Sequence, residues 1–439
     1  MRRSASSRST AHRRRPGLDR SVEVYLFPAI VGGGLGDIEE VLAAGRRLAR
    51  AGARVRLFRA PGRPWPPGVD GPWSWPPLER SRRLRPTART ALTVTPAWGI
   101  SAAPAGPPPL GRPGPWDAEA RAIEAAYGPD RVLHVSLEEF ARTLPSRAEN
   151  RERFREGGVR ARAIDVRLDR ARRAGEVDAF DRAFRRFRAF DRPDVLHLFA
   201  TFAPDRAFAR EFPAAVQTGP LWSGAPARPI ASRRRSREWV WYASPASAET
   251  IAEDVAGALE EADPTMHLFV RTPRPWSRPR ARPHVELVAA PIPPAAWRAR
   301  FAAAELRIVT GSRSLLEAIE LGGPFLYFNG VLGDGRARRR HRPEKLRALL
   351  RVARRARLAP DVVRDLAAFG RGQRVADVVR RAARGRGGWG RPWPRLGPFG
   401  FRPPFDDAGA LLEAVARALG APGASATAVV ARVRGGSNP

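Results

Sequence analysis

Residues 25–60 read "YLFPAIVGGGLGDIEEVLAAGRRLARAGARVRLFRA", and the order of elements in this stretch decides the fold. An apolar run leads into a cluster of glycines, an amphipathic segment follows, and a second apolar run ends the stretch. Apolar residues at helical spacing predict a helix over 38–51 that stops at Gly52. A strand, a glycine turn, a helix and a second strand are typical of the βαβ unit of a parallel sheet.

The same alternation continues through two blocks of the chain. In the first block we predict strands at 22–30, 55–58, 92–95, 132–135, 195–199 and 215–217, and a helix near 178–190 whose phenylalanine stripe indicates core packing. In the second block we predict strands at 239–243, 267–271, 285–289, 306–310 and 325–328, and helices at 246–262, 294–303, 315–321, 343–357, 361–369 and 374–384. The predicted fold is α/β, with two Rossmann-like domains whose parallel sheets face a central cleft.

Composition sets the expected boundaries along the chain. Residues 1–20 form a disordered basic tail, and 21–217 form the N-terminal domain with a Pro/Trp-rich insertion at 61–116. A linker at 218–237 leads to a C-terminal domain at 238–384. Residues 385–439 hold a second proline- and aromatic-rich segment and a C-terminal helix that packs back. Tryptophan in these two segments suits contact with a sugar ring or a lipid, or packing of each segment onto its domain.

The net charge of +34 is a weak guide to partners. Lysine occurs once, at Lys345, so 77 of the 78 basic residues are arginine, and they are spread through most segments. This indicates a general bias toward arginine, which disfavours nucleic acid as the partner and leaves attraction to an anionic membrane surface as a milder consequence. Cysteine is absent, which excludes disulfides and cysteine-bound zinc. With no apolar run near ~18 residues and no signal-peptide pattern, we expect a cytoplasmic protein, peripheral at the inner membrane face where it meets lipid.

The first glycine turn does not fit a dinucleotide. Counting G-x-G-x-x-G from Gly34 puts the third glycine position at Glu39. The positive end of the following helix already carries Asp37, Glu39 and Glu40, which would repel a diphosphate. The turn therefore suits a neutral hydroxyl-bearing ligand, with one carboxylate as the base. A capping box formed by Asp37 and Glu40 is the plain alternative, and an NADP oxidoreductase that uses Arg59 is a weaker one.

The second informative stretch is "AELRIVTGSRSLLEAIELGGPFLYFNG", residues 304–330. It predicts a strand, a small-residue loop, a short helix and another strand. Gly311, Ser312, Arg313 and Ser314 offer backbone N–H groups, hydroxyls and a guanidinium at the helix start, which make an anion site. A capping box of Ser314 and Glu317 is again the plain alternative. The contrast with the first turn predicts that a diphosphate binds the second domain and a hydroxyl nucleophile faces the first.

The run "TGSRSLLEAIELGGPFLYF" resembles the donor-binding segment of two-domain, GT-B-type glycosyltransferases. The pattern is most similar to the group of the undecaprenyl-diphospho-muramoylpentapeptide N-acetylglucosaminyltransferase and the related nucleotide-sugar 2-epimerases. Those proteins carry E-A-x-x-x-G-x-P, which here is Glu317, Ala318, Gly322 and Pro324. The resemblance covers roughly 22–52 and 239–384 and is looser in the first part.

This resemblance implies a role for each matching residue. Glu317 would bind the ribose hydroxyls of the nucleotide, and Gly311, Ser312 and Ser314 its diphosphate. Ser244, in "WVWYASPASAET", would be a further phosphate contact, although Ala243 and Pro245 stand where the family has glycines. The backbone of Ile292, in "ELVAAPIPPAAW", would meet the base.

The first-domain "GGGLGD" resembles the acceptor-side glycine loop of the family, here Gly33, Gly34 and Gly36. Asp37 stands in the "LGD" position, where the heptosyltransferase branch has its base, and it is the predicted catalytic residue. Arg271 ends the strand "HLFVR" and is a predicted phosphate contact.

The expected function is transfer of a sugar from a nucleotide-diphosphate-sugar to a hydroxyl acceptor, for which a lipid-linked compound is one candidate. The paired glutamates of the retaining branch are missing, since the position eight before Glu317 is Val309, and this favours inversion. No D-x-D metal motif stands in a convincing context and the histidines lack metal spacing, so we expect no metal and no cofactor. A nucleotide-sugar 2-epimerase and a non-catalytic carbohydrate- or lipid-surface binder are the alternatives. His134, His197 and His267, in predicted strands, are interpreted as satisfied histidines near strand ends.

Overall fold

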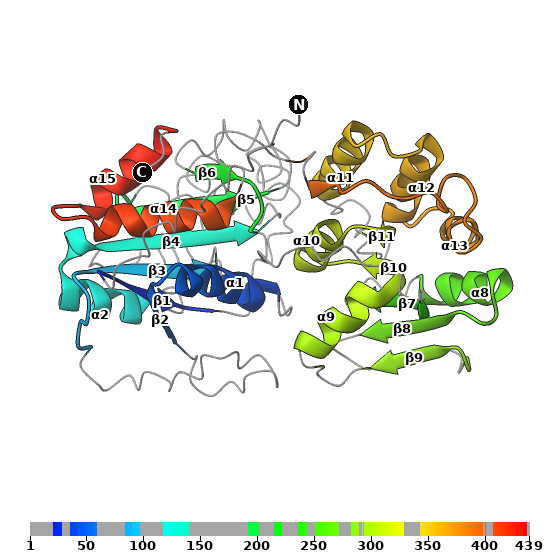
Figure 1. The fold of residues 1–439 in the computed structure, drawn as a ribbon, viewed down its shortest axis with the longest axis horizontal. Helices are drawn as coiled ribbons and strands as arrows, with labels where there is room; N and C mark the ends of the chain where they lie inside the picture. Colours follow the sequence, from blue (N-terminus) through cyan, green and yellow to red (C-terminus); the bar gives the residue numbers. More distant parts are fainter. Residues whose placement is uncertain are drawn as a thin grey trace, which may run out of the picture.

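The computed structural model describes residues 21–28, 36–58, 84–96, 117–139, 192–201, 215–221, 236–243, 251–271, 282–288, 292, 294–328, 343–397, 400 and 407–436. These residues form two parallel sheets, each with its own helices (Figure 1). The predicted tail at 1–20, the insertion at 61–116 and the helix near 178–190 lie outside the described residues, apart from 84–96 inside the insertion, which include a strand of the first sheet.

The first sheet has six strands in the order β2-β1-β3-β4-β5-β6, and all neighbours are parallel. Its strands are β1 (Val22–Leu26), β2 (Arg54–Leu57), β3 (Thr90–Pro96), β4 (Val132–Glu139), β5 (Val195–Ala200) and β6 (Ala215–Thr218). Buried apolar residues run through these strands with few breaks, as parallel strands covered on both faces require.

The second sheet has five strands in the order β11-β10-β7-β8-β9, again all parallel. Its strands are β7 (Ser236–Tyr242), β8 (His267–Arg271), β9 (Val285–Val288), β10 (Ala304–Val309) and β11 (Phe325–Tyr327). The first strand of this block lies in the middle of the sheet, so the chain first builds outward to β9 and then crosses back to β10. That order is the one of Rossmann-type sheets.

Helices connect and cover the strands. The helices are α1 (Gly36–Arg50), α2 (Asp117–Tyr127), the 3₁₀ turn η1 (Pro129–Arg131), α8 (Ala252–Ala262), α9 (Pro294–Ala303), α10 (Ser312–Leu321), α11 (Pro343–Arg355), α12 (Pro360–Gly370), α13 (Val375–Ala383), α14 (Ala408–Gly420) and α15 (Ala426–Arg434). The two all-parallel sheets with their helices confirm the predicted α/β fold of two Rossmann-like units.

The two faces of the first sheet differ in chemistry. One face is aliphatic and packs against α1, α14 and α15 in a continuous core. The other carries an aromatic group with α2, including Tyr25, Phe27 and Tyr127, and buried polar residues such as Thr93 and Ser136. Parallel register places these side chains on one face because partners in neighbouring strands point the same way.

The chain returns to the first sheet at its C-terminal end (Figure 1). Arg47 of α1 pairs with Asp407 at 3.0 Å and with Glu413 at 2.5 Å, and the Ala408 N–H donates to the carbonyl of Gly219. Two helices lie in this segment, whereas the sequence predicted one. The break falls at Gly420 to Ser425, where the Ser425 hydroxyl accepts from the Ala428 N–H and starts α15.

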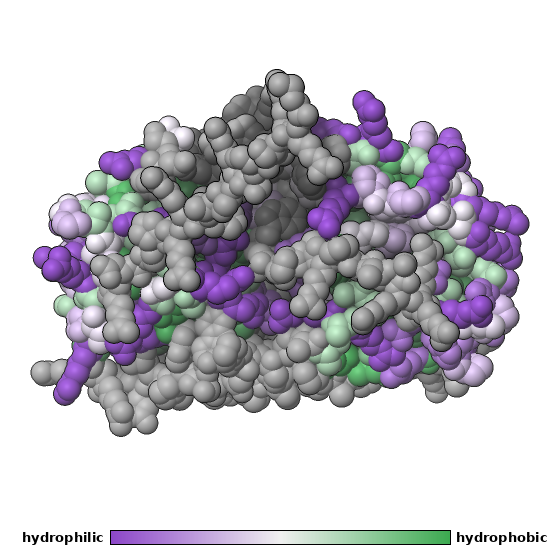
Figure 2. Space-filling model, in the orientation of Figure 1, coloured by the Kyte–Doolittle hydropathy of each residue, from purple (hydrophilic) through white to green (hydrophobic). Residues whose placement is uncertain are grey.

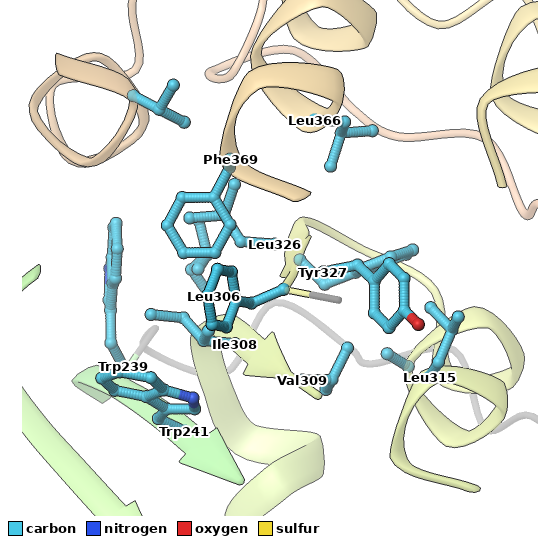
Figure 3. Close-up of a cluster of buried hydrophobic side chains, with 14 of the residues drawn as sticks. Trp239, Trp241, Leu306, Ile308, Val309, Leu315, Leu326, Tyr327, Leu366 and Phe369 are labelled. Carbon is cyan, nitrogen blue, oxygen red and sulfur yellow. The ribbon is translucent and has the colours of Figure 1, made fainter. Parts of the chain in front are cut away.

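The core of the second unit is built on paired tryptophans (Figure 3). Trp239 and Trp241 of β7 stand in register with Leu306 and Ile308 of β10, so all four lie on one face. Phe369 of α12 packs on that face in the close-up. Trp389 is buried as well and donates its ring N–H to Asp365, so this ring packs its segment onto the unit.

Most element boundaries lie within a few residues of the sequence predictions, and the differences have local causes. The helix α10 begins at Ser312 and not at Leu315, because the Ser314 hydroxyl bonds back to Gly311 and starts the helix there. The strand β7 begins at Ser236, inside the predicted linker. The helix α2 was not predicted at all.

Candidate active site between the two sheets

Each sheet has one place where strand order reverses, and ligands of open α/β sheets bind outside the carboxyl ends of the strands there. In the first sheet β2 lies on one side of β1 and β3 on the other, so the reversal is between β1 and β3. In the second sheet it is between β7 and β10. The predicted acceptor turn follows β1, and the predicted donor loop follows β10. Both predicted ligand turns therefore lie at reversal points.

The two reversal points face each other. The carboxyl ends of β4 and of β8 point toward the middle of the molecule from opposite sides (Figure 1). The helices α1 and α10, which follow the two turns, are in contact. Arg313 of α10 donates from Nη1 to the carbonyl of Leu221 at 2.9 Å, directly after the first sheet. The starts of α1 and α10 are therefore on the sides of the two units that face each other.

The donor loop is fixed by short hydrogen bonds. The Thr310 hydroxyl donates to the carbonyl of Tyr242 at 2.9 Å, which ties the end of β10 to the end of β7. The Ser314 hydroxyl accepts from the Gly311 N–H and donates to the Gly311 carbonyl, both at 3.2 Å. Ser314 is buried by this contact, so its hydroxyl holds the loop and the backbone N–H groups of the first turn remain the natural anion donors.

An aromatic pair holds Arg271 at the end of β8. Its guanidinium carbon lies 5.3 Å from the Trp297 ring centre and 5.8 Å from that of Tyr242, and the two rings meet edge to face at 5.9 Å. Such contacts restrict a long side chain without neutralising its charge. Arg271 therefore presents a fixed positive charge on the ring of Tyr242, which lies beside Gly311, and its predicted contact with phosphate stays a prediction.

Glu317 lies one turn into α10 and close to two partners. Its Oε1 is 3.7 Å from Nε of Arg313, and its charge acts on the Tyr242 phenol. Burial raises the pKa of Tyr242; Arg271 opposes that rise and Glu317 adds to it. Arg313 was predicted to help bind the anion, but it is directed instead at Leu221 and Glu317. It joins the donor loop to the first domain because the Leu221 carbonyl lies within its reach.

The acceptor side is described only in part. The helix α1 begins at Gly36, so Asp37 belongs to its first turn, while Gly33 and Gly34, together with the side chain of Asp37, lie outside the described residues. Glu39 pairs with Arg46 at 2.9 Å and Glu40 is buried. The negative field expected at this helix end is therefore weaker than the sequence suggested, because Arg46 offsets the charge of Glu39.

The remaining donor-side predictions are Ile292, Ser244 and Ser312. Ile292 is half-buried and packs against the core of the second unit just before α9. Ser244 and the side chain of Ser312 lie outside the described residues, although the backbone of Ser312 starts α10.

Sequence reasoning did not identify Tyr242 and Trp297 as site residues. Tyr242 ends the apolar run "WVWY", so the sequence predicts it only as part of a strand, and it predicts Trp297 only as part of a helix. The position of Tyr242 in the sequence could have identified it. It is an aromatic residue at the carboxyl end of the central strand, and that end lies at the reversal point. Only the packing of α9 against β7 shows that Trp297 reaches the same place.

The buried histidines belong to the core and not to this site. His134 shares a hydrogen bond of 2.7 Å with Thr93 and one of 2.8 Å with Glu124, and His197 shares one of 3.0 Å with Ser136. This confirms His134 as a satisfied histidine, since both of its ring nitrogens have partners, while His197 is buried and bonded through Nδ1. His267 begins β8 and is exposed.

Among the described residues, Glu124, His134 and Asp194 form the one cluster with metal-ligand spacing. His134 and Asp194 lie near the amino ends of β4 and β5 and Glu124 lies in α2, so the cluster is on the side of the sheet opposite the carboxyl ends of the strands. Arg192 donates to Glu124 at 2.7 Å and to Asp194 at 2.5 Å, so a guanidinium already supplies the positive charge. We therefore interpret the cluster as a structural ion network, and the expectation of a metal-free reaction stays a prediction.

This network predicts a loss of stability in acid. Burial by itself would raise the pKa of Glu124, but hydrogen bonds from His134 and Arg192 outweigh it and lower that pKa from 4.5 to about 2. The stabilisation is complete above pH 4.5 and is lost as the pH falls toward 2. Glu124→Gln should remove on the order of 2 kcal/mol from the free energy of unfolding at pH 7 and flatten this acid dependence. Urea melts between neutral and acid pH measure both effects. Exposed Asp130, as Asp130→Asn, is the matched control, and an equal loss there would contradict the assignment.

No protein-family model matches the chain, and no curated protein matches it. Solved structures do resemble it. The Arabidopsis thaliana protein UGT89C1, complexed with quercetin, shares 12% identity over 95% of this chain and 99% of its own, with a TM-score of 0.41. The glycosyltransferase SnogD from Streptomyces nogalater shares 15% identity over 86% and 97%, with a TM-score of 0.36. The glycosyltransferase VinC, in complex with DTDP, shares 15% over 82% and 94%, with a TM-score of 0.35. Because these TM-scores are below 0.5, the evidence for the fold is the order of the parallel strands in the two sheets.

Proposed function

We propose that this protein is a glycosyltransferase that moves a sugar from a nucleotide-diphosphate-sugar to a hydroxyl acceptor. One observation carries the proposal: the two parallel sheets face each other across their reversal points, the helices α1 and α10 that follow these points are in contact, and Arg313 joins the two sides. The sequence resemblance of residues 304–328 to the donor segment of GT-B-type enzymes supports the choice of ligand.

On the donor side, the backbone N–H groups of Ser312 and Ser314 bind the diphosphate, together with Arg271 and Ser244, while Gly311, whose N–H is bonded to the Ser314 hydroxyl, lets the diphosphate approach the backbone. The amino end of α10 carries no acidic residue, so its dipole adds to this attraction. Glu317 accepts hydrogen bonds from the ribose hydroxyls, and the backbone at Ile292 meets the base. Buried Ser314 contributes by holding the loop through its hydroxyl.

The proposed reaction is a single inverting displacement. The Asp37 carboxylate takes the proton of the acceptor hydroxyl, and the resulting oxygen attacks the anomeric carbon of the sugar. The bond from that carbon to the diphosphate oxygen breaks on the opposite face. The leaving group departs with its electron pair, and its added charge is stabilised by the N–H groups of α10 and by Arg271. Gly33, Gly34 and Gly36 leave room for the acceptor beside the backbone.

The donor side can be tested by binding alone. We expect one diphosphate among those of uridine, guanosine, adenosine and thymidine to raise the melting temperature of the protein. Glu317→Gln should weaken that binding by about 10- to 100-fold, since a hydrogen bond to a charged group is lost. Glu305→Gln removes the same charge at the amino end of β10 and serves as the control. No response to any of the four would contradict the proposal, and a response to NADP alone would favour an oxidoreductase.

The two alternatives give different products. A nucleotide-sugar 2-epimerase of similar fold would change the donor sugar in the absence of any acceptor, which NMR of the donor detects. A non-catalytic carbohydrate or lipid-surface binder would leave the donor intact with every acceptor offered.

We also propose cytoplasmic localisation. Within the described ranges, no helix has both the length and the apolar character needed to cross a bilayer.

A further inference from the structure

The positive charge of the chain is concentrated over α11, α12, α13 and the segment after them. Residues 343–395 contain fourteen arginines and one lysine against four acidic residues, which is about a third of the net charge of +34 in about an eighth of the chain. A general bias toward arginine explains the total but not this local excess. Hydrophilic side chains project from the part of the molecule that holds these helices (Figure 2).

The helix α11 has a buried apolar face and an exposed basic face. Leu346, Leu349 and Val352 are buried in the core of the second unit. Among the residues of the helix from 345 onward, those exposed are Arg347, Arg351, Arg354 and Arg355, which we call the α11 arginine face. Arg351 lies four residues from both Arg347 and Arg355 and three from Arg354, so all four lie on one side of the helix. The face is therefore a single line of guanidinium groups directed to solvent.

The α11 arginine face differs from the arginines of the neighbouring helices. Arg364 pairs with Asp361, Arg380 with Asp377, and Arg381 with Asp365. Within the described part of the chain, no carboxylate pairs with the four arginines of the face. Like charges at these spacings repel each other along the helix. A partner with repeated negative charge would relieve that repulsion.

We propose that the α11 arginine face docks the protein on the surface of a bilayer that contains anionic phospholipid. The apolar side of α11 is already buried in the core, so the helix has nothing to insert among acyl chains and binding must be electrostatic. Guanidinium groups suit phosphate headgroups because they donate two parallel hydrogen bonds. Among the described residues of 343–395, the two tryptophans pack on each other at 5.4 Å and Phe369 is buried, so the surface offers no exposed ring for a nucleic-acid base. This proposal does not depend on the proposed enzymatic function.

The test is co-sedimentation of the full chain with vesicles. Vesicles of phosphatidylcholine alone are compared with vesicles of equal parts phosphatidylcholine and phosphatidylglycerol, at low and high salt. The unchanged protein should bind only the anionic vesicles and lose binding as salt rises. The triple variant R347Q/R351Q/R354Q should bind them about 100-fold more weakly, at roughly fivefold per arginine.

The matched control is R121Q/R131Q/R432Q, which removes three exposed arginines from the first unit. It should keep most of the affinity, and both triple variants should melt as the unchanged protein does. Equal losses in the two variants would overturn the proposal, because net charge alone would then explain binding. Failure of the unchanged protein to bind anionic vesicles would also overturn it. Binding of duplex DNA in place of vesicles would assign the face to nucleic acid.

Discussion

Replacement of Asp37 with asparagine should lower the turnover of sugar transfer by about 10²- to 10⁴-fold, the range for loss of a positioned general base. Asparagine keeps the size of the side chain and a hydrogen-bonding oxygen but cannot take a proton at neutral pH. Donor affinity should stay unchanged, since the donor binds at Gly311 to Glu317 on the other unit. The measurement is the turnover number with saturating donor, beside a titration of the nucleoside diphosphate.

Glu39→Gln is the matched control for Asp37→Asn. It makes the same change of charge in the same region of α1, but Glu39 is held by Arg46 at 2.9 Å and is assigned no part in the reaction. Its turnover should fall by less than about fivefold. Full activity of Asp37→Asn would remove Asp37 as the base. Equal, large losses in both variants would show that the charge of the helix end matters and not a proton at Asp37.

The parallel sheets could be predicted because their strands are short apolar runs between glycine, proline and charged residues. The strand β8, predicted at 267–271, has those bounds in the structure. The helix α2 was missed because it follows the long proline-rich segment and consists mostly of alanine and charged residues. Only Ala120, Ile123 and Tyr127 mark its buried side, and their meaning depends on the aromatic face of the first sheet.

The sequence could predict the parts of the candidate site that are formed by backbone turns. It could not predict the parts that depend on how side chains from different elements pack together. Glycines and small residues after a strand indicate a ligand turn, which located Gly36 and Gly311. The contact of Arg271 with Trp297 depends on where α9 crosses β7, and the contact of Arg313 with Leu221 joins residues 92 positions apart. Residue spacing carries no information about either. The sequence likewise could not show that Arg46 offsets the charge of Glu39.

Replacement of Arg307 with methionine should reduce the free energy of unfolding of the second unit by about 3 kcal/mol. Arg307 is 1% exposed in β10 and donates to the carbonyls of Phe301, Ala302 and Gly322 at 2.6, 3.0 and 2.7 Å. These carbonyls end α9 and α10, where the last carbonyl groups of a helix have no partner within the helix. One guanidinium thus satisfies two helix ends and offsets their negative dipole ends.

The expected loss is the balance of two opposing effects. Burial lowers the pKa of Arg307 to about 10, so holding the charge in the core is itself costly, and methionine removes that cost. Methionine fills similar space but leaves three carbonyls without their donor, and this outweighs the gain. Lysine should not rescue the loss, because its single ammonium group cannot span three carbonyls in the geometry of a guanidinium fork.

Hydrogen exchange of the backbone amides of β10 and α10 at increasing urea concentration is the suitable measurement, because it reports on the second unit alone. Arg300→Met is the matched control: Arg300 pairs with Glu238 and Glu286 and its side chain is 36% exposed, so its loss should cost less than about 1 kcal/mol. Because Arg307 holds the ends of α9 and α10, which carry Trp297 and Gly311 at their other ends, the folded variant should also bind nucleoside diphosphate more weakly. Stability equal to that of the unchanged protein would mean that the three carbonyls find other donors. In that case the donor loop would not depend on Arg307 for its position.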